Sequence, residues 1–184
     1  MKNIAIFIAN GFEDAEAIVT FDVLKRANLN VELVSITDEY FVDSQAKITV
    51  KAHKLINDID EDSYDCFVLP GGKLGYENLS KSAKLKSIIV NANKNHKIIA
   101  AICAAPQLLG KWNLVNKVDV TSYPGSKDHL NKAIYHTDVA AITSDNIITG
   151  ASAGTVFQFS RAILDVLVEP EVHNEVFSKL VMMD

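Results

Sequence analysis

The 184-residue chain has few of the residues that mark small secreted, fibrous or disordered proteins. Its two cysteines cannot form a disulfide framework, and it has only four prolines and eight glycines. Because 48% of the residues are hydrophobic and the net charge is only −5, the chain can bury a sizeable core. We therefore expect one domain spanning residues 1–184, and the scarcity of cysteine favours a cytoplasmic protein.

A second group of absences concerns partners and cofactors. The 18 basic residues are outnumbered by 23 acidic ones and form no basic stripe, so we expect no nucleic-acid partner. The longest apolar run, from Ile98 to Pro106, is far shorter than the ~20 residues of a membrane helix, so we expect no membrane association. Nucleotide-binding motifs and metal-binding spacings of Cys and His are missing as well, and we expect neither a cofactor nor a metal.

The chain does contain an alternation of strands and helices. Apolar runs predict buried strands at residues 4–8, 31–36, 65–69, 98–102 and 146–149. Apolar residues at helical spacing predict one helix after a Ser82 cap, and another from Val156 to Leu167 that Pro170 stops. Residues 37–64 are less regular, and we expect an antiparallel excursion or a β-hairpin at the sheet edge. This alternation predicts an α/β fold with a mostly parallel sheet covered on both faces.

The predicted helix from Asp14 to Ala27 differs from the others because its apolar residues lie on most sides of the cylinder. A helix that is apolar nearly all round is buried on more than one side. In a chain of this length, the second side is available to a partner subunit. We therefore expect a homodimer.

Ligands in such folds bind at the carboxyl ends of the strands, which directs attention to residues 10–16, 70–75 and 103–106. Cys103 lies where a buried strand passes into a helix expected to begin at Ala104, with Pro106 in its first turn. This is the position of a nucleophile elbow, where a helix N-terminus lowers the pKa of a thiol. Free cysteine is also often a small buried hydrophobe, and the residues alone leave both interpretations of Cys103 open. For Cys66, in mid-strand, we expect a structural role.

Acidic residues and glycines accompany Cys103 at this edge of the sheet. Glu13, Asp14 and Glu16 at the start of the first helix complement its dipole, which is the simplest interpretation of them. If one of them faces Cys103 in an apolar pocket, desolvation raises its pKa and it can serve as a general acid or base. The backbone N–H groups of Gly71-Gly72 and of Ala104 are candidates for an oxyanion site, although Pro-Gly is also an ordinary turn.

The three loops together resemble the ThiJ/PfpI superfamily, in its protein-deglycase branch. The resemblance covers nearly the whole chain and rests on three segments in this order and spacing: Gly-Phe-Glu-Asp-Ala-Glu at 11–16, Leu-Pro-Gly-Gly at 69–72 and Ala-Ala-Ile-Cys-Ala-Ala-Pro at 100–106. It implies a flavodoxin-like three-layer sandwich and a homodimer. It also implies a reactive Cys103, a protonated partner at Glu16 and an oxyanion site from the backbone of Gly72 and Ala104.

The chain departs from the family pattern at three positions. Ala104 stands where peptidase-like members have a histidine, which disfavours a Cys–His dyad and peptidase activity. Tyr123 precedes Pro124 where many members of the branch have a histidine, and a neutral phenol is a poor base at pH 7. Gln45 lies where the resemblance leads us to expect a basic residue, so the pocket is expected to be less cationic.

Three functions remain open at this point. The first is a cofactor-free glyoxalase or deglycase acting on small 2-oxoaldehydes or their adducts, with the Cys103 thiolate as nucleophile and Glu16 as proton shuttle. The second is a chaperone-like, redox-sensing stress-response protein that acts through oxidation of Cys103. The third is a binding scaffold in which the site is vestigial.

Overall fold

Strand β1 (Asn3–Ile8) runs through the centre of the molecule because both of its faces are apolar. In the computed structural model, which describes residues 1–182, β1 pairs in parallel with β2 (Asn30–Ser35) and with β6 (Cys66–Leu69). Side chains alternate across a strand, so Ile4 and Ile6 join one core cluster whereas Ala5 and Phe7 join the other. The continuous apolar run is therefore divided between two separate cores.

The central sheet orders its seven strands β10-β11-β7-β6-β1-β2-β5. The strands not yet introduced are β5 (Lys54–Leu55), β7 (Ile98–Ile102), β10 (Ala141–Ser144) and β11 (Ile147–Gly150). Neighbouring strands are parallel except for the antiparallel pair β10–β11. All five predicted strands are present within one residue of their expected bounds, and the mostly parallel sheet is confirmed.

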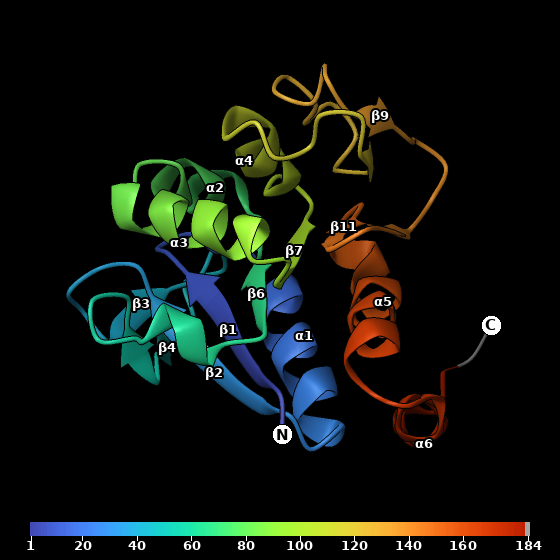
Figure 1. Ribbon diagram of the computed structural model, residues 1–184. Helices are drawn as coiled ribbons and strands as arrows, with labels where there is room; N and C mark the ends of the chain where they lie inside the picture. Colours follow the sequence, from blue (N-terminus) through green and yellow to red (C-terminus); the bar gives the residue numbers. More distant parts are fainter. Residues whose placement is uncertain (183–184) are drawn as a thin grey trace.

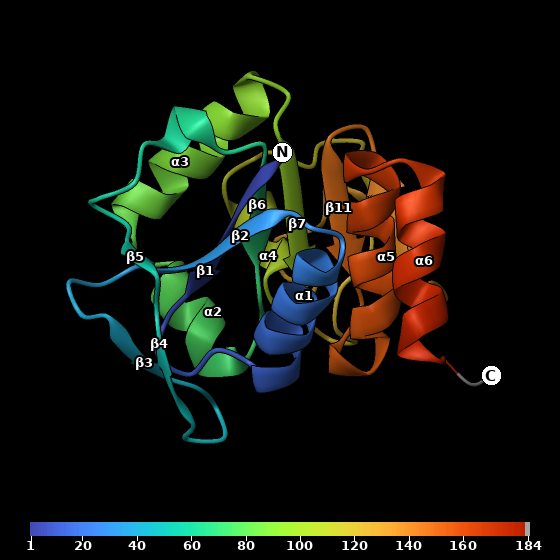
Figure 2. The ribbon, with the colours of Figure 1, turned by 90° about the horizontal axis from the view of Figure 1, so that it is seen from below.

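Helices cover both faces of the sheet (Figures 1 and 2). One face carries α1 (Asp14–Arg26), α5 (Val156–Leu167) and α6 (Pro170–Leu180), and the other carries α2 (Lys73–Leu79), α3 (Ala83–Lys94) and α4 (Pro106–Lys111). Ser82 Oγ accepts the N–H of Leu85 at 3.1 Å, as the predicted cap of α3 requires. The three-layer α/β sandwich of flavodoxin-like type is thus confirmed. Within residues 1–182, every helix is too short or too polar to cross a membrane.

Smaller elements lie outside the central sheet. The predicted excursion at 37–64 contains an antiparallel hairpin of β3 (Phe41–Asp43) and β4 (Thr49–Lys51), and the same segment adds β5 at the sheet edge. A short parallel pair joins β8 (Asp119–Val120) to β9 (Ile134–Tyr135). Single 3₁₀ turns occur at Glu61–Ser63 and Ala153–Thr155.

One predicted helix boundary was wrong and one helix was not predicted, and both involve a proline. The helix after Cys103 begins at Pro106, not Ala104, and has only six residues. The helix predicted from Val156 to Leu167 has those bounds and ends before Pro170, which is the first residue of α6, a helix that the periodicity did not predict. Proline is acceptable at the first helical position, where its missing N–H is not needed. The same residue can therefore end one helix pattern or begin the next.

Candidate active site

The carboxyl ends of β1, β6 and β7 meet at one edge of the sheet, as parallel strands require. The loops that leave these strands are the three singled out from the sequence. They line a cleft of about 750 Å³, to which they contribute Glu13, Glu16, Gly72, Cys103 and Ala104. The β3–β4 turn, α2, Gln107 of α4, the loop after β8 and residues 152–154 after β11 complete its walls. The structure thus brings residues from three distant segments to one cavity.

Cys103 occupies a backbone conformation that side chains seldom adopt. Its φ is 64°, in the left-handed region, which costs a non-glycine residue about 1–2 kcal/mol. Two bonds hold the turn: the Cys103 N–H donates to the Gly150 carbonyl at 3.0 Å, and its own carbonyl accepts the Tyr123 N–H at 2.9 Å. The side chain is half-buried and lines the cleft, whereas Cys66 is fully buried in β6. The sharp turn predicted for a nucleophile elbow is present.

Glu16 lies in the first turn of α1 and is completely buried. Its backbone N–H donates to the Glu13 carboxylate at 2.9 Å, so Glu13 is the N-cap of the helix. Its side chain enters the cleft, where Oε2 accepts the Gly71 N–H at 2.6 Å. Within residues 1–182, the other oxygen, Oε1, has no hydrogen-bond partner. Helix-dipole compensation alone therefore does not account for Glu16, because an acid serving the dipole needs no burial.

Gly71 and Gly72 let the end of β6 approach the two reactive side chains. A Cβ at Gly71 would lie 2.8 Å from Cβ of Cys103 and 2.8 Å from Oε2 of Glu16, which leaves no room for any side chain. Gly72 has a φ of 83°, and a Cβ there would approach the Gly11 carbonyl to 2.5 Å. The glycine pair is thus required by the packing of the site.

Electrostatically, Glu16 and Cys103 act as a pair. Burial raises the pKa of Glu16 to about 7, while the neighbouring Cys103 thiol and the hydrogen bond from the Gly71 N–H oppose the rise. Burial, and then the adjacent Glu16 carboxylate, raise the pKa of the Cys103 thiol to about 12, while the backbone N–H groups of Gly72 and Ala104 lower it. The predicted lowering of the thiol pKa was therefore wrong in direction, because burial and a like charge outweigh a short helix that begins only at Pro106. The pair loses its first proton near pH 7.

Other cleft residues form a polar rim. Tyr123 lines the cleft with its side chain 50% exposed, and Gln45 reaches it from the β3–β4 turn. Sequence reasoning missed three further residues of the rim, which are Tyr76, Glu77 and Asp128. The first two lie one helical turn beyond Gly72, a signal that was available, but Asp128 lies in a loop without periodicity. Across the described part of the chain, no group of three His, Cys, Asp or Glu side chains is arranged to hold a metal ion.

Comparisons with known proteins match the chain to one family and one fold. The model of the DJ-1/PfpI family matches residues 2–166. The Parkinson disease protein 7 homolog of Danio rerio is 30% identical over 186 residues, covering 100% of this chain and 98% of the relative. A Schizosaccharomyces pombe protein named glutathione-independent glyoxalase DJ-1 is 24% identical, covering 99% and 100%. The structure of oxidized Toxoplasma gondii DJ-1 superposes with a TM-score of 0.93 at 27% identity, covering 100% of both chains.

Proposed function

Because the chain belongs to the DJ-1/PfpI family, we propose that it is a cofactor-free enzyme that converts small 2-oxoaldehydes to 2-hydroxy acids. One observation carries this proposal: a fully buried carboxyl group with a pKa near 7 faces the only cysteine that lines the cleft of the described residues. A group that titrates near the operating pH is suited to general acid–base chemistry. The relative named as a glutathione-independent glyoxalase supports the same assignment.

The first step is addition of Cys103 to the aldehyde carbon. Sγ forms a bond to that carbon, the carbonyl π bond breaks, and the thiol proton passes through Glu16 to the new alkoxide, which gives a hemithioacetal. Thiolate with neutral carboxyl, and thiol with carboxylate, differ only in the position of one proton. The pair can therefore supply the nucleophile once it has lost its first proton. The backbone N–H groups of Gly72 and Ala104, which already point at the sulfur, would stabilise the developing negative charge.

The second step moves hydrogen between the two substrate carbons. The Glu16 carboxylate removes the proton from the former aldehyde carbon, an enediol forms, and the proton returns to the neighbouring carbon. The first carbon is thereby oxidised to an acyl group and the second is reduced to an alcohol, so no external oxidant or reductant is needed. Water then cleaves the thioester, which releases the 2-hydroxy acid and the free thiol.

Adducts of the same aldehydes with amines or thiols would enter by the same chemistry, which is the deglycase form of the proposal. Peptidase activity is disfavoured, because Ala104 follows the nucleophile and none of the residues lining the cleft is a histidine.

The test of the proposed activity is lactate formation from methylglyoxal without glutathione. We expect turnover in the natural protein and in Cys66→Ala, and a loss of at least about 10³-fold in Cys103→Ser. Full activity in Cys103→Ser, or no lactate from the natural protein, would refute the proposal.

Oxidation of Cys103 is a second candidate function. Cys103 is half-buried and lines the cleft, whereas Cys66 is fully buried, so only Cys103 meets dissolved peroxide. The oxidized state in the name of the Toxoplasma gondii structure is consistent with this role in a relative. After mild peroxide treatment, mass spectrometry should find added oxygen on Cys103 alone. Equal oxidation of both cysteines would contradict this function.

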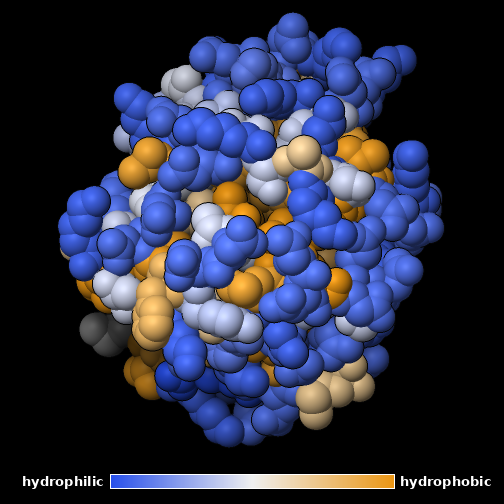
Figure 3. Space-filling view, turned by 90° about the vertical axis from the view of Figure 1, so that its left-hand side faces the viewer, coloured by the Kyte–Doolittle hydropathy of each residue, from blue (hydrophilic) through white to orange (hydrophobic). Residues whose placement is uncertain are grey.

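We also propose a cytoplasmic homodimer. On α1, Ile18 is 39% exposed next to the buried Ala17, and the adjoining β3–β4 hairpin exposes Phe41 and Ile48. The hairpin lies against α1, because the Ala46 N–H donates to the Asp14 carboxylate at 3.1 Å. Apolar patches also reach the surface among hydrophilic residues on the side toward the left of Figure 1 (Figure 3). Light scattering should give twice the chain mass at micromolar concentration, and a stable monomer would refute the dimer.

A further inference from the structure

The charges around the cleft are unbalanced. Besides Glu16, three carboxylates line it, those of Glu13, Glu77 and Asp128, against the single ammonium group of Lys73. Throughout residues 1–182, no Lys, Arg or His nitrogen lies within 4.0 Å of these three carboxylates, since none of them occurs among the ion pairs. Most surface carboxylates repel anions only weakly, but charges that line a concave wall reinforce one another.

An aromatic side chain lines the same cleft as two of these acids. Tyr76 lines the cleft from α2, and Glu77 and Asp128 are close enough to raise the pKa of its phenol, after burial as the larger cause. The hydroxyl of Tyr76 makes no hydrogen bond to any of the described residues. A neutral ring and two carboxylates in one cleft offer a cation both a π face and counter-charges. Tyr76, Glu77 and Asp128 are called the acidic rim below.

A second and independent observation points to a bound molecule in the same cavity. Glu16, which is completely buried, leaves Oε1 without a hydrogen-bond partner at the end of the cleft where Cys103 lies. A buried polar oxygen without a partner costs about 1–3 kcal/mol, and a bound molecule that donates a hydrogen bond to it would recover that cost. The acidic rim lines the same cleft as the sulfur, so a molecule that enters the cleft meets its charges.

We infer that the acidic rim selects substrates by charge: cationic carbonyl compounds are preferred, neutral ones are accepted and carboxylate-bearing ones are excluded. The class of substrate is a small aldehyde, or an aldehyde adduct, that carries an ammonium or guanidinium group. Its cationic end lies over Tyr76 between Glu77 and Asp128, and its carbonyl reaches Cys103. This inference rests on the proposed function, because it concerns the same cleft.

The test measures access to the sulfur and requires no turnover. Three methanethiosulfonate reagents of similar size, one with a trimethylammonium group, one neutral and one with a sulfonate, form a mixed disulfide with Cys103 and release methanesulfinate. Second-order rates at pH 7.5 are divided by the rates with free 2-mercaptoethanol, which removes the intrinsic reactivity of each reagent. Labelling of Cys103→Ala gives the background, and mass spectrometry confirms the labelled residue.

We expect the normalised rate of the cationic reagent to exceed that of the anionic reagent by at least about tenfold, and 0.5 M salt to reduce the ratio. Glu77→Gln/Asp128→Asn should bring the ratio within about threefold, whereas the matched charge change Glu171→Gln/Glu175→Gln on α6 should leave it unchanged. Equal or anion-favouring rates, an unchanged ratio in the rim variant or failure of all three reagents to label Cys103 would overturn the inference. If methylglyoxal turnover is absent while the charge ratio is found, the proposed function fails and the charge selection stands.

Discussion

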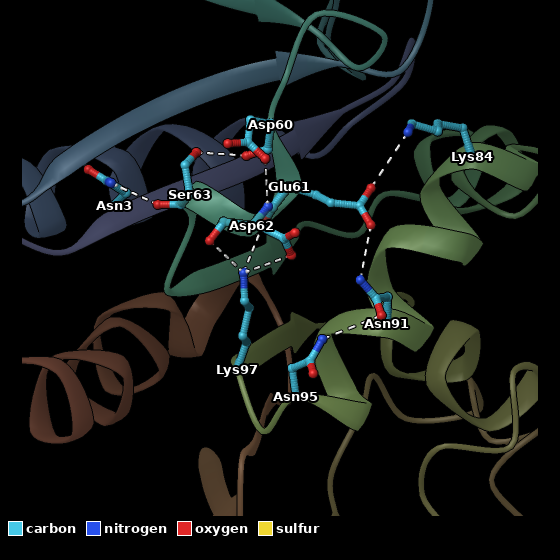
Figure 4. Close-up of polar contacts among 9 residues, drawn as sticks. All are labelled: Asn3, Asp60, Glu61, Asp62, Ser63, Lys84, Asn91, Asn95 and Lys97. Carbon is cyan, nitrogen blue, oxygen red and sulfur yellow. Dashed lines mark hydrogen bonds and ion pairs between the residues drawn. The ribbon is translucent and has the colours of Figure 1, made fainter.

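The same three strands, β1, β6 and β7, present opposite chemistry at their two ends. At their amino ends the polar groups are paired (Figure 4). Lys97 Nζ donates to the carbonyls of Glu61 and Asp62 at 2.9 Å each, and Asn91 donates to the Glu61 carboxylate at 3.1 Å. At their carboxyl ends, Glu16 keeps an oxygen without a partner and Cys103 holds a left-handed backbone. The amino ends contribute stability, whereas the strain and the unpartnered oxygen at the carboxyl ends lower stability and form a reactive site.

The reactive end also lowers the free energy of unfolding in a way that depends on pH. Because burial raises the pKa of folded Glu16 from 4.5 to about 7, the folded state binds this proton more tightly than the unfolded state does. Burial of Glu16 therefore does not lower the free energy of unfolding below pH 4.5, but it lowers this free energy progressively as the pH rises toward 7. The full shift corresponds to roughly 3 kcal/mol.

Glu16→Gln tests this contrast with the largest expected effect. Gln preserves the acceptor for the Gly71 N–H but cannot carry a proton between carbons, so turnover should fall by about 10²–10⁴-fold. At the same time, the free energy of unfolding of the variant relative to the natural protein should rise by roughly 2–3 kcal/mol between pH 5 and pH 8. Turnover and urea unfolding at both pH values give the two quantities. A stability difference that does not vary with pH would show that the folded carboxyl titrates normally.

Lys97→Met tests the paired end. Met retains an apolar side chain but loses the ammonium group, which lies 5.9 Å from the centre of the Phe67 ring and donates to both carbonyls, so the free energy of unfolding should fall by about 1–2 kcal/mol. Turnover per folded molecule should not change.

Lys84→Met is the matched control for this change. Lys84 forms only a half-exposed ion pair with Glu61 at 3.5 Å, so its loss should cost less than about 0.5 kcal/mol. Equal losses in the two variants, or a change of turnover in Lys97→Met, would remove the distinction between the two ends.

Tyr123→Phe should have the smallest effect. The side chain is 50% exposed, and its hydroxyl makes no hydrogen bond to residues 1–182, so we expect turnover to change by less than about threefold. Steady-state rates with methylglyoxal measure this. A loss of tenfold or more would mean that the phenol takes part in proton transfer, at the position where the family resemblance led us to expect a histidine.

The fold was largely predictable because its signals are local. An apolar run identifies a buried strand wherever it pairs, and the sharp turn at Cys103 follows from a strand that meets a short helix. The state of the site was not predictable in this way. The acids at 13–16 fit a helix dipole equally well, and only the packing of Gly71 against Glu16 distinguishes the buried residue from its neighbours. The acidic rim needed Asp128, which a loop without periodicity brings to the cleft.

The pH dependence of Cys103 alkylation by iodoacetamide tests the shared proton most directly. If Glu16 and Cys103 titrate as a pair, the rate in the natural protein rises through an inflection near pH 7, and this inflection is absent from Glu16→Gln. A single inflection near the ordinary thiol pKa of ~8.5 in both proteins would contradict the account, because the Glu16 carboxyl would then have no effect on the titration of the Cys103 thiol.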